Sequence, residues 1–191
     1  SVSHCGLVLF AILMMNQAAS TGAVIQMLSH GLMTALFFAA IGMIYERTHT
    51  RMLAQLGGLL KVMPFISSIF VIAGLCSLGL PGFSGFVAEM TVFMGSWQHV
   101  ETGYRIATIL SCASIVVTAV YILRAAGKSI MGPIVDEHHL HLSDATWNEK
   151  LAAIVLLVGI VTIGIAPFWL SDLIGPGVHG LMANIGRSIL S

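Results

Sequence analysis

A single glutamate, Glu89, lies inside the longest apolar stretch of the chain. Between Lys61 and Glu101 it is the only carboxylate, and that interval contains no lysine or arginine. Just before it stands a run that a straight helix would avoid, Gly79-Leu80-Pro81-Gly82-Phe83-Ser84-Gly85. An ionisable side chain at membrane depth is costly and usually functional, and broken helices are typical of ion and proton carriers. A low-dielectric site favours the neutral carboxyl, so the pattern predicts a proton-exchanging group.

The helix break itself is predicted from residue type. Proline has no amide hydrogen and clashes with the preceding turn, and glycine relaxes the backbone. The residues expected to break the helix are Gly79, Pro81, Gly82 and Gly85. A structural carboxyl bonded to Ser84 or to a neighbouring helix is the alternative interpretation of Glu89.

A polar stripe on the second apolar stretch extends this candidate site. Gln26, His30 and Thr34 recur at i, i+4 and i+8, so they share one face of a helix. Histidine can gain or lose a proton near neutral pH. His4 also lies at membrane depth or near an interface. We interpret His30 and His4 as proton-transfer groups, with histidines packed between helices as the alternative.

Hydroxyl side chains form a further stripe on the fourth apolar stretch. Ser111, Ser114, Thr118 and Tyr121 recur at i, i+3, i+7 and i+10. Such a stripe can bond neighbouring helices or line a file of water. The residues predicted to support the polar axis are Gln26, Thr34, Ser84, Ser111, Ser114 and Thr118.

The densest cluster of metal-ligating residue types is Asp136-Glu137-His138-His139-Leu140-His141. Three histidines and two acids could bind zinc or nickel, but closed sites usually draw on separated ligands held by a fold. A solvated loop without metal is therefore the preferred interpretation. The sequence contains no CxxC pair, Gly-rich phosphate loop or haem motif. We expect no cofactor and no redox centre in this chain.

The composition is that of an integral membrane protein. Hydrophobic residues make up 57% and charged residues 8%, against roughly 45–50% and about 25% in ordinary globular chains. The formal net charge of zero gives no indication of a nucleic-acid partner. The chain starts at Ser1 without signal-peptide features, so we expect a fragment of a longer protein.

Five apolar stretches predict an all-α membrane bundle of about five transmembrane helices. A crossing of about 30 Å needs roughly 20 helical residues. The third stretch is long enough for two crossings. A single crossing, discontinuous near 79–85, is preferred because it places six of the eight basic residues beside two loops, 46–61 and 124–150, which are then cytoplasmic. The expected spans are 1–15, 19–45, 62–97, 106–123 and 151–171.

The last residues follow a different pattern. Val178, Leu181, Met182, Ile185 and Ile189 recur with helical spacing, and polar residues lie away from them. This predicts a short amphipathic helix on the membrane surface. The predicted organisation is a transmembrane bundle over 1–175 and an interfacial helix over 176–191.

Long motifs give the chain a family resemblance. They are Ser3-His4-Cys5-Gly6, the segments 22–32, 45–51 and 57–59, and the segment 77–89. With them the chain resembles the C-terminal half of the antiporter-like membrane subunits of NADH:quinone oxidoreductase, respiratory complex I. The subunit-4 type, chain M in bacterial naming, is the best match. The resemblance covers residues 1 to about 123 strongly and the rest by hydropathy only.

The resemblance implies roles for three residues. Glu89 matches the ionisable residue of the discontinuous twelfth helix, proposed as a proton site on the exit side, where sibling subunits usually have lysine. His30 resembles the histidine of the central polar axis, and His4 the histidine one helix earlier. The family's other axis residues belong to helices before Ser1. We therefore expect no pumping by this chain alone.

The resemblance also implies partners and a location. NAD, FMN, iron–sulfur clusters and quinone would be bound by partner subunits. The partners would be other membrane subunits, including neighbouring antiporter-like subunits, and the lipid bilayer. A bacterial inner membrane is expected, with a mitochondrial inner membrane as the alternative. The alternative functions are a subunit of a multisubunit cation/proton antiporter, a subunit of a membrane-bound hydrogenase, or a structural remnant without transport.

Overall fold

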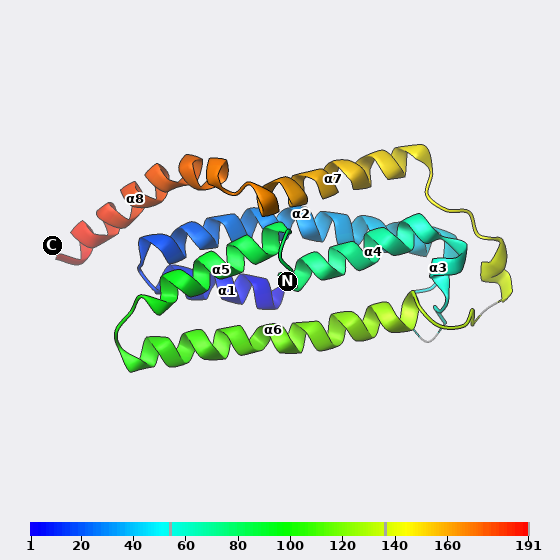
Figure 1. Cartoon of the computed structure of the whole chain (residues 1–191), viewed down its shortest axis with the longest axis horizontal. Helices are drawn as coiled ribbons and strands as arrows, with labels where there is room; N and C mark the ends of the chain where they lie inside the picture. The colour runs from blue at the N-terminus through cyan, green and yellow to red at the C-terminus, as the bar shows by residue number, and fades with distance from the viewer. Residues whose placement is uncertain (54, 136, 191) are drawn as a thin grey trace.

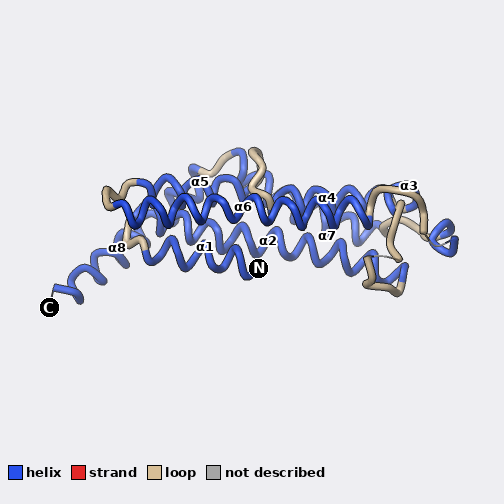
Figure 2. The backbone as a smooth tube through the Cα atoms, turned by 90° about the horizontal axis from the view of Figure 1, so that it is seen from below, coloured by secondary structure: helices blue, strands red, loops and turns tan. Residues whose placement is uncertain are grey.

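The computed structural model describes residues 1–53, 55–135 and 137–190, and every regular element in these ranges is a helix (Figure 2). This confirms the predicted all-α class. The elements are α1 (Val2–Leu13), α2 (Gln17–Thr48), α3 (Leu59–Val62), α4 (Pro64–Ser77), α5 (Ser84–Trp97), α6 (Thr102–Ser129), the 3-10 helix η1 (Glu137–His141), α7 (Trp147–Ile165) and α8 (Phe168–Leu190).

Three helices, α2, α6 and α7, are each long and apolar enough to cross a membrane. Helices α4 and α5 have 14 residues each, or about 21 Å of helix. They lie end to end along the bundle and run in the same direction (Figure 1). The third apolar stretch therefore forms one discontinuous crossing, as predicted, and α1 adds a shorter apolar helix.

The two loops predicted to share a side lie at the same end of the bundle (Figure 1). The amide of Gly58 donates to the carbonyl of Met131 at 3.3 Å, and the amide of Leu60 donates to the carbonyl of Ile130 at 3.1 Å. The helix order thus confirms that the third stretch crosses once. The cytoplasmic location of this end stays a prediction.

The break between α4 and α5 covers residues 78–83. Gly79 and Gly82 have φ of +64° and +98°, in the left-handed region that favours glycine. The prediction of Gly85 as a breaker was wrong, because it lies in the first turn of α5. A Cβ atom at Gly85 would be 2.5 Å from the carbonyl oxygen of Cys76, so its small size allows close packing instead.

The end of the fifth apolar stretch also differs from the sequence prediction. The fifth apolar stretch was expected to continue to residue 171, but α7 ends at Ile165 and α8 begins at Phe168. Pro167 lies at this corner, and its carbonyl accepts from the amides of Leu170 and Ser171 at 3.1 and 3.0 Å. Helix α8 then continues through Pro176 and extends away from the bundle (Figure 1). Its interfacial position stays a prediction.

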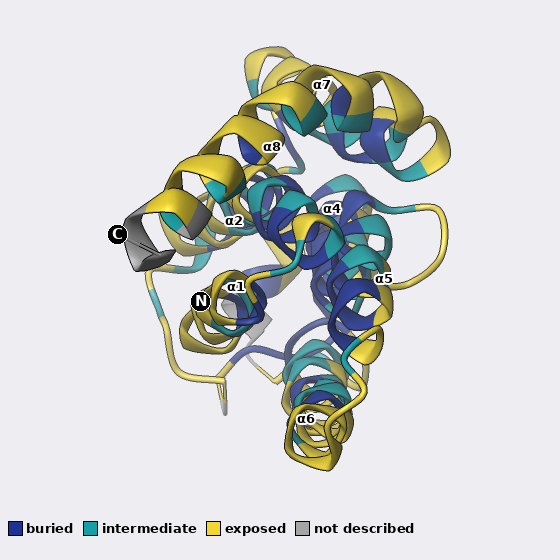
Figure 3. Ribbon diagram, turned by 90° about the vertical axis from the view of Figure 1, so that its left-hand side faces the viewer, coloured by how far each residue is buried: buried dark blue, intermediate teal, exposed yellow. Residues whose placement is uncertain are grey.

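Helices α2, α4 and α5 form the buried centre, and α6 and α7 flank it with exposed outer faces (Figure 3). The contact between α2 and α5 is close because two glycines lie in it. A Cβ atom at Gly22 would be 2.7 Å from the amide nitrogen of Val92, and one at Gly95 would be 2.8 Å from Cα of Ala19. Such small-residue contacts are the usual means of close helix packing in membranes.

Candidate functional site

Glu89 lies on the second turn of α5, directly beside the helix break. Its side chain is 9% exposed and its carboxyl group reaches back to the loop at Gly79. A Cβ atom at position 79 would overlap Oε2 of Glu89 and lie 3.0 Å from its Cδ. The carboxyl group therefore occupies space that is free only because residue 79 is glycine.

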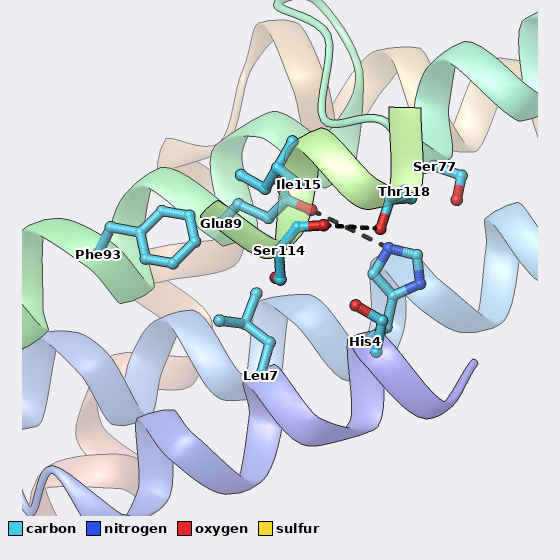
Figure 4. A pocket seen from close by; sticks show the side chains of 9 residues that line it. His4, Leu7, Ser77, Glu89, Phe93, Ser114, Ile115 and Thr118 are labelled. Carbon is cyan, nitrogen blue, oxygen red and sulfur yellow. Dashed lines mark hydrogen bonds and ion pairs between the residues drawn. The ribbon is translucent and has the colours of Figure 1, made fainter. Parts of the chain in front are cut away.

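His4 reaches the same carboxyl from α1 (Figure 4). Its Nε2 lies 4.0 Å from Oε1 of Glu89, and its side chain is also 9% exposed. This separation is too long for a direct hydrogen bond and suits a contact bridged by one water molecule. Nδ1 of His4 is buried without a hydrogen-bond partner among the described residues. His4 and Glu89 are thus a buried base and a buried acid, 4.0 Å apart and without a direct hydrogen bond.

A small cavity of about 10 Å³ is lined by both groups and has space for about one water molecule. The hydroxyl stripe of α6 contributes two of its residues. Ser114 donates to the carbonyl of Ser111 at 2.6 Å, and Thr118 donates to the carbonyl of Ser114 at 3.3 Å. These hydroxyls therefore bond their own helix and face the cavity. Its lining consists of Ser3, His4, Leu7, Ser77, Glu89, Phe93, Ser114, Ile115 and Thr118.

His30 of α2 contacts His4 and does not line the small cavity beside Glu89. His30, His4 and Glu89 are called here the row of proton-transfer residues. The two imidazole centroids are 5.0 Å apart, and the Thr34 hydroxyl lies 3.3 Å from Nδ1 of His30. Two wider cavities, of about 310 and 220 Å³, border both histidines. The structure therefore brings together the three residues predicted for proton transfer, in the order His30, His4, Glu89.

Gln26 and Ser84, which were also predicted to support the polar axis, do not line the small cavity. Gln26 is 1% exposed, and its Oε1 lacks a hydrogen-bond partner among the described residues. Ser84 shares a 2.7 Å hydrogen bond with Ser29 of α2. This bond fixes the start of α5 to α2. One form of the alternative interpretation, a bond from Ser84 to Glu89, is not found in the described residues.

Ser29, Ser77 and Phe93 are site residues that the sequence did not single out. Ser29 and Ser77 stand inside the long motifs, but neither carries a charge or a periodic partner that marks it. Phe93 follows Glu89 by one helical turn and closes the cavity (Figure 4). The i+4 spacing was the one readable signal for Phe93.

The histidine-rich segment differs from the expected solvated loop. Glu137–His141 form a 3-10 helix that packs against α3, and His139 is 5% exposed. Asp136 lies outside the described residues. Among the residues that the structure describes, no three histidine, cysteine or acidic side chains come together in a way that could hold a metal ion.

These features define a class: a membrane helical bundle with a buried carboxyl beside a discontinuous helix. The family model described as "NADH:quinone oxidoreductase/Mrp antiporter, TM" matches residues 1–115. The chain belongs to this family of transmembrane proteins, which confirms the resemblance carried by its motifs.

Similar proteins include NAD(P)H-quinone oxidoreductase chain 4 1 of Synechococcus elongatus, 41% identical over 87% of this chain and 32% of the relative. NADH-quinone oxidoreductase subunit M of Rhodobacter capsulatus is 36% identical over 96% of this chain and 35% of the relative. The chain thus spans about a third of the length of these relatives.

Solved structures share the fold at low identity. One is respiratory complex I from Thermus thermophilus with bound NADH, with a TM-score of 0.84, 22% identity, and coverage of 94% of this chain and 37% of that chain. Another is the Mrp complex from Dietzia sp. DQ12-45-1b, with a TM-score of 0.82, 20% identity, and coverage of 95% and 41%.

Proposed function

We propose that this chain carries part of an intramembrane proton path in a membrane subunit of NADH:quinone oxidoreductase, of the subunit M or chain 4 type. The observation that carries the proposal is the row His30, His4 and Glu89, which leads from wider cavities to a buried carboxyl. The named relatives support the choice of enzyme complex.

The physical mechanism is a switch in the protonation of Glu89. Burial favours the neutral carboxyl, whereas water entry or a nearby positive charge favours the carboxylate. Water in the small cavity would pass the proton between Glu89 and His4. Oxidation of NADH and reduction of quinone would occur in partner subunits and bias this balance by conformational or electrostatic coupling. The proposed setting is a bacterial inner membrane beside other antiporter-like subunits.

The test is NADH-driven proton uptake by inverted membrane vesicles that contain the assembled complex. Glu89→Gln retains size and hydrogen bonding but cannot titrate, so uptake is expected to fall by roughly tenfold or more. Glu89→Asp should retain part of the activity, and Glu89→Lys can still titrate and should be partly active. The control is Glu101→Gln, which alters an exposed carboxylate at the end of the bundle. Normal uptake by a normally assembled Glu89→Gln complex would remove Glu89 from the path.

A second candidate function is supported by the likeness to the Mrp complex. In that case the chain would belong to a cation/proton antiporter. Co-purification separates the two candidates. Flavin and iron–sulfur subunits in the isolated assembly support the oxidoreductase, and their absence from an intact assembly supports the antiporter.

A further inference from the structure

The last turn of α7 lies directly against the helix break, at a point where only glycine fits. A Cβ atom at Gly164 would overlap the carbonyl oxygen of Gly82 and lie 2.6 Å from the carbonyl carbon of Phe83. Figure 1 shows the end of α7 beside the loop that joins α4 to α5. Both neighbours are backbone atoms, so a side chain at 164 could be accommodated only by moving the loop or the helix.

The same corner also contacts α5 next to the carboxyl. Ile163 is 3% exposed and belongs to a buried cluster with Ala88, the residue before Glu89. Leu170 of α8 belongs to this cluster too, together with Ile25 of α2. The α7–α8 corner, defined here as residues 163–170, therefore touches both the break loop, at Gly82 and Phe83, and the helix α5 that follows it.

A displacement at Gly82 would be transmitted to Glu89 because the loop is short and tied by hydrogen bonds. The amide of Phe83 donates to the carbonyl of Leu80 at 3.2 Å, and the amide of Gly79 donates to the carbonyl of Cys76 at 3.1 Å. Gly79 stands three residues before Gly82 and lies against the Glu89 carboxyl. The loop thus connects α7 to the carboxyl through one short, hydrogen-bonded segment.

We propose that Gly164 is a positioning residue for Glu89, and that the α7–α8 corner holds the loop in the place that the carboxyl needs. The inference rests on the proposed function only in naming Glu89 as the group that exchanges protons. It predicts that a change in α7, which carries none of the row of proton-transfer residues, alters the behaviour of Glu89 itself.

The test compares Gly164→Ala with Gly159→Ala in the assembled complex. A Cβ atom at Gly159 would meet only the side chain of Leu32 at 3.6 Å, an ordinary contact. Alanine is the better helix former at both positions, so neither change weakens α7 itself. The readout is labelling of Glu89 by a hydrophobic carbodiimide, which reacts with the protonated carboxyl, quantified by mass spectrometry as a function of pH. Gly164→Ala is expected to move the half-labelling pH by about half a unit or more. Gly159→Ala should leave it unchanged.

The outcomes separate this inference from the proposed function. An unchanged labelling profile in Gly164→Ala would show that the positioning inference is wrong, whatever proton uptake is measured. A shifted profile together with normal uptake in Glu89→Gln would support the positioning contact and contradict the proposed function. If Gly164→Ala fails to assemble, Ile163→Val provides the same readout, since it removes one methyl group from the buried cluster that joins the corner to Ala88. An unchanged profile in that variant would equally contradict the inference.

Discussion

The carboxyl group of Glu89 occupies the space that a side chain at position 79 would need. Gly79 therefore serves two purposes, since its φ of +64° turns the chain out of α4 and its missing side chain leaves room for the carboxyl. The helix break is thus part of the site, because it provides one wall of the space around the acid.

Replacing Gly79 with alanine is expected to impair proton uptake and to lower the stability of the subunit. A left-handed backbone costs a residue with a Cβ atom about 1–2 kcal/mol, and the new methyl group would also displace the carboxyl. Gly132→Ala, in the loop that follows α6, is the matched control. Gly132 has φ of +98° and no atom within 4 Å of the added Cβ, so it tests backbone strain away from the carboxyl. Proton uptake in vesicles should fall more in Gly79→Ala than in Gly132→Ala, and equal losses would contradict the role of the contact.

Arg47 is expected to tolerate lysine poorly, because it joins α2 to α7 through both carboxylate oxygens of Glu149. The two bonds measure 3.1 and 2.7 Å, and the guanidinium also donates to the carbonyls of Ser143 and Asp144 at 2.8 and 3.2 Å. Lysine cannot reproduce this forked geometry. Arg47→Lys should lower stability by about 1–3 kcal/mol, seen as a lower temperature at which the purified assembly loses this subunit. Arg124→Lys, at an exposed position on α6, is the control. If both variants lose the subunit at the same temperature, the paired hydrogen bonds from Arg47 to Glu149 do not contribute to stability.

The shared end of loops 46–61 and 124–150 is expected to face the cytoplasm, because six basic residues gather there. Single cysteines at Thr50 and Ser143, in a chain lacking the three native cysteines, should resist an impermeant maleimide applied to intact cells. A cysteine at Val100, which is 82% exposed at the opposite end, should react. The reverse labelling pattern would show that the subunit has the opposite orientation in the membrane. Different results at Thr50 and Ser143 would contradict the single crossing of the third apolar stretch.

Hydropathy and the Pro/Gly run were enough to predict the helical class, the crossing pattern and the break. The C-terminal end of α2 was predicted too short, because polar residues such as Glu46 and Arg47 continue the helix to Thr48. One start signal was readable and was missed. Thr146 and Glu149 form a reciprocal capping box that begins α7 at Trp147.

Some residues of the candidate site could be predicted from the sequence, and the contacts that position them could not. Glu89, His4 and His30 could be selected from sequence because ionisable groups are rare in apolar helices. The contacts of Gly164 with Gly82, and of Ser84 with Ser29, join residues at least 55 positions apart. No local pattern marks such pairs, because the packing of α7 and α2 against the break decides them.

Glu89 is expected to exchange a proton during turnover, and infrared difference spectroscopy of the assembled complex can detect that exchange. Turnover driven by NADH should produce a difference band from the C=O stretch of a protonated carboxyl, shifted in D₂O. This band should be lost in Glu89→Gln and retained, at an altered frequency, in Glu89→Asp. An identical carboxyl difference band in wild type and Glu89→Gln would show that Glu89 does not exchange a proton during turnover.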